Sequence, residues 1–418
     1  MKVFIVGNGG REHAMAWKIK QNPKIEKIFS TPFNTGINEI GECAKIDVLN
    51  FENLTKFAKE KEIDLAIVST DNPLVEGLVD VFENHNIRVF GPNKKAAMIE
   101  GSKIFSKELM KKYKIPTAKY EIFDKKIKAM EYVKKKNEYP IVIKADGLAY
   151  GKGVIIAHNF EEANTAVEKI MKEKIFGKSG DKIIIEDFLF GEEFSVLAFT
   201  DGKTIKLMPI AKDYKKIFDD NKGPNTGGMG SISPGETQDK ILIEEYMEKI
   251  FIPTIRAMEK EGRKYKGVIY FGLILTDDGV KVIEYNCRFG DPETQVILPK
   301  LKTDLIEIFD SIIDEKLNEI NIEWKNLSTV CVILASKGYP EKYEIGHEIY
   351  GLKNLEKENI LIFHSGTKTE KEKILTNGGR VVGIVGCEKT IAESRKKTYN
   401  NIKNISFENM YFRKDIGK

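Results

Sequence analysis

The chain has 418 residues, of which 41% are hydrophobic and 31% charged, with a formal net charge of +4. At about 150 residues per domain it is too long for one ordinary domain, and the near-balance of charge argues against a dedicated nucleic-acid binder. The four cysteines are far apart and form no Cys-x-x-Cys pair, which argues against zinc ligation and a disulfide framework.

The first hundred residues alternate strand and helix signals. No signal peptide precedes the first apolar run and no run approaches the roughly 20 residues of a membrane span, so we expect a cytoplasmic protein with no membrane partner. The predicted elements are strand Val3–Val6, helix His13–Lys20, helix Phe51–Lys61, strand Leu65–Val68, helix Leu74–Asn84 and strand Val89–Phe90. This alternation predicts an α/β domain with a doubly wound parallel sheet over residues 1–100, ended by Gly91-Pro92-Asn93.

Three further units are expected, at 101–190, 191–325 and 326–418, and they are α+β in character. In the first we predict helix Ser102–Tyr113, strand Pro140–Lys144, a glycine-rich turn Asp146–Gly153, strand Val154–Ala157, helix Glu161–Lys172 and strand Lys182–Glu186. In the second we predict strand Phe194–Phe199, a helix Asp239–Glu261 bent or interrupted at Pro253, and a hairpin of Val268–Leu275 with Val280–Ile283. The small C-terminal domain, with strands Val330–Leu334 and Arg380–Val385, carries no obvious catalytic cluster.

The strand that begins at Val280 ends in a dense polar run, Glu284 to Gln295. Residues two apart on a strand share a face, so Val280, Val282, Glu284 and Asn286 are expected to point the same way. A carboxylate beside an amide carbonyl suits a hard cation such as Mg²⁺ or Mn²⁺, especially one that also holds nucleotide phosphates. The sequence therefore predicts a reaction centre at this strand end.

A glycine turn, Gly7 to Glu12, follows the first strand and opens a helix. A dinucleotide fingerprint would place glycine where Glu12 stands, so binding of a nicotinamide cofactor is disfavoured. Binding of another anion at the helix N-terminus, helped by Arg11, and a purely structural tight turn both remain open.

Two segments favour a nucleotide. In Lys144–Gly153, three glycines between apolar strands form a flap whose amides can cover phosphates, with Lys144 as a point charge; a lysine-decorated hairpin turn is the alternative. The segment Glu186–Glu193 can offer backbone groups to an adenine edge, an apolar slot and a carboxylate for ribose, although alone it would be a solvated acidic turn.

The segment Gly223–Ser231 is too glycine-rich for an ordinary connection. Such backbone can donate N–H groups to an oxyanion, although a mobile loop has the same composition. The charged residues before it, Lys212, Asp213, Lys215 and Lys216, favour an anionic substrate.

Several motifs in order resemble one family, phosphoribosylamine–glycine ligase, also called glycinamide ribonucleotide synthetase, of the ATP-grasp superfamily. They are Gly9–Ala14, Glu100–Lys103, Lys144–Ala149 with Gly151–Val154, Gly223–Gly230 and Asn286–Gln295. The resemblance implies an ATP-grasp fold and the ATP-dependent joining of glycine to 5-phosphoribosylamine in purine synthesis, through glycyl phosphate. Whether the active form is a monomer or a weak homodimer stays open.

The resemblance also implies roles for particular residues, which fall into four sets. The ATP set is Lys103, Lys144, Gly147, Gly151, Lys152, Gly153, Glu186, Phe188, Leu189 and Glu193. The metal set, for Mg²⁺ or Mn²⁺, is Glu284 and Asn286. The substrate set is Gly9, Gly10, Arg11, Asn225, Thr226, Gly227, Gly228, Arg288, Gly290 and Asp291. The catalytic set is Arg288, Asp291 and Lys144.

Two segments depart from the family pattern. Ser69–Leu74 stands where the family has a Gly-Pro-Glu segment, and Ala211–Lys216 stands where it reads Ala-Gln-Asp-His-Lys-Arg. Both are expected near phosphoribosylamine. The competing hypotheses are a different ATP-grasp ligase or carboxylase, whose relatives lack the Gly223–Gly230 loop, and a non-catalytic nucleotide-binding module.

Overall fold

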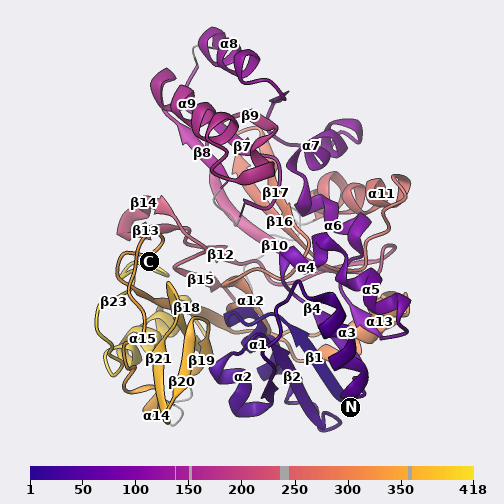
Figure 1. Cartoon of the computed structure of the whole chain (residues 1–418), viewed down its shortest axis with the longest axis vertical. Helices are drawn as coiled ribbons and strands as arrows, with labels where there is room; N and C mark the ends of the chain where they lie inside the picture. Colours follow the sequence, from indigo (N-terminus) through magenta and orange to yellow (C-terminus); the bar gives the residue numbers. More distant parts are fainter. Residues whose placement is uncertain (137, 150–152, 236–243, 356–359) are drawn as a thin grey trace.

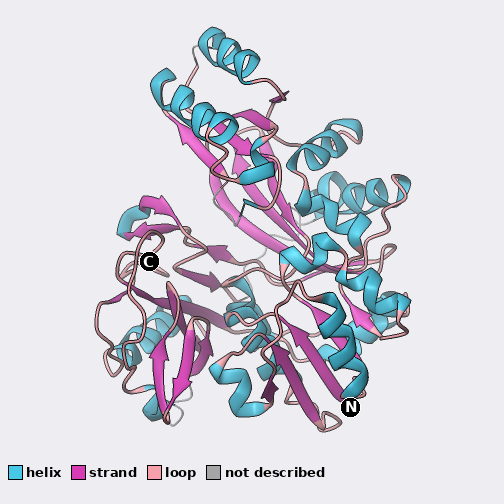
Figure 2. Cartoon of the chain, in the orientation of Figure 1, coloured by secondary structure: helices cyan, strands magenta, loops and turns pink. Residues whose placement is uncertain are grey.

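The computed structural model describes residues 1–136, 138–149, 153–235, 244–355 and 360–418 (Figure 1). Within these residues the strands form four larger sheets and two short two-stranded ribbons. Figure 2 shows one lobe standing above two lower regions, which contain the two chain termini. No helix in the described part of the chain is both long and apolar enough to span a membrane.

The N-terminal sheet is parallel, with strand order β3-β2-β1-β4-β5, which confirms the predicted doubly wound unit. Its strands are β1 (Lys2–Val6), β2 (Lys27–Thr31), β3 (Glu42–Cys43), β4 (Leu65–Val68) and β5 (Val89–Phe90). Its helices are α1 (Gly10–Ile19), α2 (Thr35–Ile40), α3 (Phe51–Glu60), α4 (Asp71–Glu76), α5 (Leu78–Asn84) and α6 (Lys94–Gly101). The next helix, α7 (Lys103–Lys112), packs against α6. The central strands are buried on both faces, which explains their continuous apolar sequences.

The single helix predicted over Leu74–Asn84 is wrong. The structure has α4 and α5, separated at Gly77, whose φ of 96° is left-handed. Glycine adopts this conformation readily because it lacks a Cβ, so the chain changes direction there. The break lets α4 start at Asp71, directly after β4.

The upper lobe consists of an antiparallel sheet in the order β6-β9-β7-β8. Its elements are β6 (Tyr120–Phe123), α8 (Lys126–Lys136), β7 (Ile141–Ala145), β8 (Val154–Ala157), α9 (Phe160–Val167) with a π-helical turn at Glu168–Lys172, and β9 (Ile183–Asp187). The buried apolar side chains of these strands and helices form a hydrophobic core of their own. The lobe is therefore held to the rest of the chain by connections and polar contacts more than by a shared core.

The central sheet has the order β11-β10-β16-β17. Its strands are β10 (Glu192–Thr200), β11 (Ile205–Leu207), β16 (Gly267–Thr276) and β17 (Gly279–Asn286). Its helices are α11 (Ile252–Lys260), α12 (Glu293–Ile297) and α13 (Leu305–Ile313). Of the long helix predicted over Asp239–Glu261, residues 239–243 lie outside the described residues, and a π-helical turn, Met247–Phe251, precedes Pro253.

The expectation that Val280, Val282, Glu284 and Asn286 share one face is wrong. The pairing of β16 with β17 shifts by one residue, since Leu273 pairs with Val282 and Gly272 with Glu284. Ile283 is therefore an extra residue, a β-bulge that reverses the alternation. Val280 and Val282 face the core, and after the bulge Glu284 and Asn286 face the opposite way.

The C-terminal sheet has the order β12-β15-β18-β22-β19, with β23 also paired to β18. Its elements are β12 (Lys212–Asp213), β15 (Gly230–Ser233), β18 (Ser328–Ser336), β19 (Leu361–His364), β22 (Arg380–Glu388), α15 (Ile391–Ile402) and β23 (Met410–Tyr411). The two ribbons are β13 (Lys216–Phe218) with β14 (Lys222–Asn225), and β20 (Thr367–Glu370) with β21 (Lys373–Thr376); α14 (Leu352–Leu355) lies nearby in sequence. Two strands of this sheet thus come from the middle of the chain.

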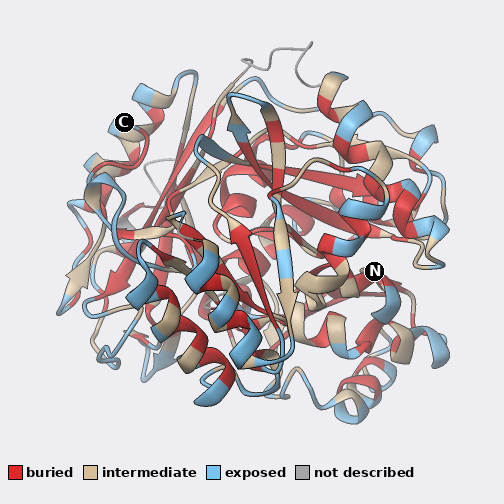
Figure 3. Ribbon diagram, turned by 90° about the horizontal axis from the view of Figure 1, so that it is seen from above, coloured by how far each residue is buried: buried red, intermediate tan, exposed pale blue. Residues whose placement is uncertain are grey.

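The three lower sheets share hydrophobic cores. One cluster joins Phe4 and Val68 of the N-terminal sheet to Phe271 of the central sheet, and another joins Ile5 to Leu197 and Ile333. Figure 3 shows the strands of the interior as mostly buried. Because apolar burial is the main stabilising term in folding, these sheets form one cooperative body.

A buried histidine pair joins the N-terminal and C-terminal regions. His13 Nδ1 accepts the His364 backbone N–H at 2.9 Å, and His364 Nδ1 lies 3.0 Å from Thr367 Oγ1. Burial lowers the pKa of His364 from 6.5 to about 4 and that of His13 well below 6.5, because desolvation disfavours the charged form.

We expect acid to destabilise the fold through these histidines. Since their folded pKa values are depressed, the unfolded chain takes up protons first as pH falls below about 6.5, and stability declines towards pH 4. For His364 alone the loss is on the order of 3 kcal/mol. Urea unfolding at several pH values should show this slope reduced in His364→Gln and unchanged in His85→Gln, where the side chain is exposed. Equal slopes in all three proteins would contradict the assignment.

Candidate active site

A cavity of about 700 Å³ lies between the upper lobe and the lower body. It brings together most of the residues that the sequence singled out. The predicted residues that line it are Lys103, Lys144, Gly153, Glu186, Phe188, Leu189, Glu193, Asn225, Thr226, Gly227, Glu284, Asn286, Arg288, Gly290 and Asp291. Gly151 and Lys152 lie outside the described residues.

At the upper end of the cavity a carboxylate binds two lysines. Glu186, at the end of β9, is paired with Lys144 of β7 at 3.0 Å and with Lys107 of α7 at 2.8 Å. All three are buried, and burial lowers the pKa of Lys107 to about 8, although Glu186 opposes this. Glu186 therefore uses its side chain to hold lysines, so its backbone is the part that can meet an adenine edge. Lys107 escaped the sequence analysis, although it stands one helical turn after Lys103.

The flap is tied to the start of α7. Asp146 accepts from Ser102 Oγ (3.0 Å) and from the Ile104 N–H (3.1 Å), which caps the helix. Lys103 Nζ donates to the Gly147 carbonyl at 2.5 Å. Lys103 and Lys144, which the resemblance assigns to ATP, line the same cavity, and their contact with phosphate stays a prediction.

Glu284 and Asn286 face the cavity because of the bulge at Ile283. Burial by itself raises the pKa of Glu284, but Lys215, Lys144, Lys103 and Arg288 outweigh it and hold the carboxyl below its usual pKa. Lys215 Nζ lies 3.7 Å from Glu284 Oε1. The group is thus an ionised carboxylate that lines the cavity among four cationic neighbours.

Glu100, at the end of α6, fixes this strand end. It accepts from the Cys287 N–H (2.7 Å), from Asn286 Nδ2 (3.1 Å) and from Arg288 Nη2 (3.0 Å). The amide nitrogen of Asn286 is held by the protein, so its oxygen is the end that would meet a cation. Glu100 lies in the Glu100–Lys103 motif, but no pattern in the sequence predicted this role for it.

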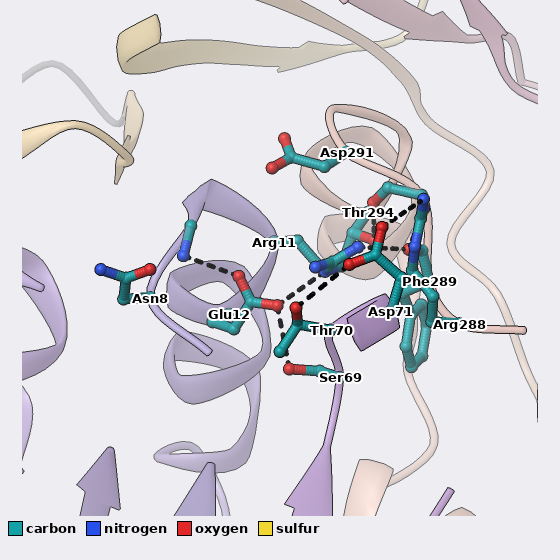
Figure 4. A network of polar contacts seen from close by, with 12 residues as sticks. Asn8, Arg11, Glu12, Ser69, Thr70, Asp71, Arg288, Phe289, Asp291 and Thr294 are labelled. Atoms are coloured by element: carbon teal, nitrogen blue, oxygen red, sulfur yellow. Dashed lines mark hydrogen bonds and ion pairs between the residues drawn. The ribbon is translucent and has the colours of Figure 1, made fainter. Parts of the chain in front are cut away.

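The crevice between β1 and β4, where the strand order reverses, is filled by protein side chains (Figure 4). Open α/β sheets bind ligands at this point. Here Glu12 accepts from the Gly9 N–H (2.7 Å), Arg11 Nε (2.7 Å) and Ser69 Oγ (2.9 Å). A Cβ at Gly7 would lie 2.7 Å from Glu12 Cγ. Glu12 thus accepts a backbone N–H that an anion would otherwise bind, which favours a purely structural role for this turn.

The Arg11 guanidinium is engaged by protein groups on two sides, since besides its bond to Glu12 it donates to the Phe289 carbonyl at 2.9 Å. Gly9 and Gly10 lie behind the cavity wall: a Cβ at Gly9 would be 3.2 Å from Asp291 Oδ2, and one at Gly10 would be 2.6 Å from Gln295 Nε2. Direct substrate contact by these three residues remains a prediction. Asp71, to which the sequence analysis assigned no role, also lines the cavity. Its Oδ2 lies 4.0 Å from Arg288 Nη2.

Glu12→Gly should destabilise the protein without creating a dinucleotide site. The change leaves Arg11 buried without its carboxylate, a loss that costs about 3–5 kcal/mol. Urea unfolding measures the loss, and Glu12→Gln, which keeps the shape, should lose less. An unchanged midpoint, or binding of a nicotinamide dinucleotide by Glu12→Gly, would contradict this account.

The residues of Ala211–Lys216 that differ from the family pattern lie in different places relative to the cavity. The Tyr214 side chain turns away from the cavity: its hydroxyl accepts the Gly417 N–H at 3.1 Å, and the Arg413 guanidinium lies over its ring. Lys212 and Lys216 line the cavity, and Lys212 is paired with Glu192 at 2.6 Å. Only the two lysines can therefore alter contacts within the cavity.

The Asn225–Gly228 loop lies beside the Arg288–Asp291 segment. Arg380 donates from Nη1 to the carbonyls of Gly227 (2.6 Å) and Asp291 (2.9 Å), and from Nη2 to Asp291 Oδ2 (3.1 Å). This arginine belongs to the C-terminal domain, in which the sequence shows no obvious catalytic cluster. Gly228 was predicted to bind substrate, but a Cβ there would be 2.4 Å from Pro292 Cδ, so this glycine permits close packing.

Comparison with known proteins identifies the family. The models of the N domain, the ATP-grasp (A) domain and the C domain of phosphoribosylglycinamide synthetase match residues 1–100, 101–294 and 329–418. The chain belongs to the phosphoribosylglycinamide synthetase family. The ATP-grasp fold predicted from the sequence is thereby confirmed.

Two relatives within the family match along almost their full length. The phosphoribosylamine–glycine ligase of Caldanaerobacter subterraneus is 50% identical over 416 residues, which cover 100% of this chain and 99% of the relative. The crystal structure of the phosphoribosylamine–glycine ligase of Thermotoga maritima is 33% identical with a TM-score of 0.85, over 99% of this chain and 100% of that one. The biotin carboxylase domain of Hydrogenobacter thermophilus 2-oxoglutarate carboxylase (16% identity, TM-score 0.73, 98% and 91% coverage) shares the fold alone.

Proposed function

We propose that this chain joins glycine to 5-phosphoribosylamine with ATP, giving glycinamide ribonucleotide, ADP and phosphate in purine synthesis. The observation that carries the proposal is the shared cavity. It places the buried lysines beside Glu284 and Asn286, and both beside Arg288, Asp291 and the glycine loop. We infer the substrates from the named activity of the relatives, and the groups that would carry out the reaction from the residues that line the cavity.

ATP would lie between the upper lobe and the central sheet. Phe188 and Leu189 follow Glu186 at the lobe edge and offer an apolar slot for adenine, and Glu193 is available to the ribose hydroxyls. Lys103 and Lys144 would face the phosphates, because their ammonium groups reach the cavity from two elements joined by the flap.

A divalent cation, Mg²⁺ or Mn²⁺, fits the residues present. Among the described residues no cluster of three or more His, Cys, Asp or Glu side chains could hold a metal by itself. An ionised Glu284 and the Asn286 oxygen are two hard donors, and such ions commonly complete their shell with phosphate oxygens and water. When bound there, the ion would neutralise phosphate charge during phosphoryl transfer.

The reaction needs two steps because a carboxylate is a poor electrophile. First, the glycine carboxylate oxygen attacks the γ-phosphorus, the bond to the bridging oxygen of ADP breaks, and glycyl phosphate forms. Lys103 and Lys144 offset the charge of the transferred group, and catalysis is mainly positioning and electrostatics. Then the amine nitrogen of phosphoribosylamine attacks the acyl carbon, phosphate leaves and the nitrogen loses a proton.

We assign Arg288 and Asp291 to the second step. Both line the substrate side of the cavity, and Arg288 would stabilise the negative charge that develops on the acyl oxygen. Burial by itself raises the pKa of Asp291, but Arg380 and Arg11, together with Gln295 and Arg288, outweigh it and hold the carboxyl below its usual pKa. We assign Asp291 to the ammonium group of glycine, which it would hold by charge.

The deciding experiment measures phosphate release from ATP with glycine alone, with phosphoribosylamine alone and with both. Turnover that requires both substrates, with glycinamide ribonucleotide as product, supports the ligase. Release supported by bicarbonate would favour a carboxylase, and no release under any condition would refute the proposal.

We place this activity in the cytoplasm, a location supported by the four free cysteines, which are typical of a reducing compartment.

A further inference from the structure

The glycine loop at the substrate side of the cavity is held by the C-terminal domain through both polar groups of one residue. The Gly227 N–H donates to the Tyr339 hydroxyl at 2.9 Å, and the Gly227 carbonyl accepts from Arg380 Nη1 at 2.6 Å. The neighbouring Thr226 is fixed to Lys215, whose carbonyl accepts from the Thr226 N–H (2.8 Å) and hydroxyl (2.7 Å). The loop that lines the cavity is therefore anchored at successive residues.

The same arginine holds the other half of the substrate wall. Arg380 Nη2 is paired with Asp291 Oδ2 at 3.1 Å, and its Nη1 also reaches the Asp291 carbonyl. The second carboxylate oxygen, Asp291 Oδ1, accepts from Gln295 Nε2 at 2.7 Å. The Arg380 guanidinium and the Gln295 amide thus each donate to one oxygen of the Asp291 carboxylate. Together they fix the orientation of the carboxylate as well as its position.

Glycines beside Arg380 and in the loop leave room for the contacts of Arg380 and Tyr339 with Gly227. A Cβ at Gly379 would lie 2.1 Å from the Tyr339 ring, and one at Gly227 would lie 3.0 Å from Arg380 Cζ. Glycine at these two positions lets the ring and the guanidinium approach the backbone. The fit involves three separate segments of the chain, around residues 227, 339 and 379.

We propose that Arg380 is a positioning residue, with Tyr339 as its partner, through which the C-terminal domain sets the affinity for glycine and phosphoribosylamine but not for ATP. The inference rests on the proposed function and extends it to a domain that supplies no group to the nucleotide end of the cavity among the described lining residues. Arg380 acts through Asp291 and the loop, since its contacts are to those groups.

The kinetic test compares Arg380→Met with the unaltered enzyme. We expect KM for glycine or phosphoribosylamine to rise about tenfold or more, as for the loss of a charge-assisted hydrogen bond, while KM for ATP changes by less than about twofold. Arg380→Lys should recover part of the loss. The matched control is Arg395→Met, in the same domain, because Arg395 donates to the backbone carbonyls of Ile416 and Lys414. Equal rises in all three KM values, or none, would overturn the inference.

A second measurement does not depend on activity. Tyr339→Phe keeps the ring and removes only the acceptor of the Gly227 N–H. Hydrogen exchange at Gly227 should then accelerate by about tenfold or more in that variant and remain unchanged in Arg395→Met. Unchanged exchange in Tyr339→Phe would refute the anchor. If the two variants show this exchange pattern but the unaltered protein makes no glycinamide ribonucleotide, the proposed function fails and the anchor stands.

Discussion

Replacing Glu284 by glutamine should lower kcat/KM by at least about a hundredfold and leave the fold intact. Groups that only orient a metal ligand are worth about 10- to 100-fold, so a charged ligand itself should exceed that range. Glu284 is ionised among four cationic neighbours, and glutamine preserves its shape while removing its charge. Steady-state kinetics across a range of Mg²⁺ concentrations would show the loss, with partial recovery at high Mg²⁺.

The matched control is Glu192→Gln. Glu192 also lines the cavity, but its carboxylate is exposed and paired with Lys212, so the change should have little effect. Circular dichroism and thermal unfolding would establish that both variants fold. Full activity of Glu284→Gln at limiting Mg²⁺ would contradict the metal role.

Replacing Arg288 by methionine should lower kcat/KM by about 10²- to 10³-fold, the range for loss of one stabilising donor in a transition state. Arg288 donates from Nη2 to Glu100 and from Nη1 to the Phe289 carbonyl (3.1 Å). Its Nε is buried and, within the described residues, has no hydrogen-bond acceptor. Buried donors are nearly always satisfied, so a substrate oxygen is the acceptor we expect.

Stability and activity should separate in a double variant. Arg288→Met alone weakens the contacts of Glu100 and should cost about 1–3 kcal/mol of unfolding free energy. Adding Glu100→Gln removes the unpaired charge and should restore part of that stability, whereas turnover stays low. Recovery of turnover with stability would show that Arg288 acts only on the fold, and unchanged turnover in Arg288→Met would refute its role outright.

Local patterns in the sequence could locate the strand ends that carry Lys144 and Glu186, and the family resemblance singled out Lys103. The structure brings all three residues to one cavity, and their contact with ATP stays a prediction. The orientation of Glu284 was reached by a wrong argument, because the one-residue bulge at Ile283 is not visible in an apolar run. Across this bulge the valines face the core and Glu284 and Asn286 face the cavity.

The remaining features depend on contacts between distant parts of the chain. Arg380 meets Gly227 across 153 residues, and Glu100 meets Arg288 across 188. Neither pairing leaves a periodic signal, and Tyr214 could not be excluded from the cavity until its partner Gly417 was known. Side-chain direction at such positions is set by packing between sheets, which a single sequence does not encode locally.

The position of β15 in the C-terminal sheet has a practical consequence for dissecting the protein. This strand pairs along its length with β18, from Gly230 opposite Val332 to Ser233 opposite Thr329. A fragment ending near residue 325 would keep β15 but lose its neighbour, leaving an unpaired strand edge next to an exposed apolar surface. Such edges recruit strands from other molecules. Shortened versions made to isolate the catalytic part should therefore aggregate, and a usable fragment would have to retain β18 and β22, joined if necessary by a new linker.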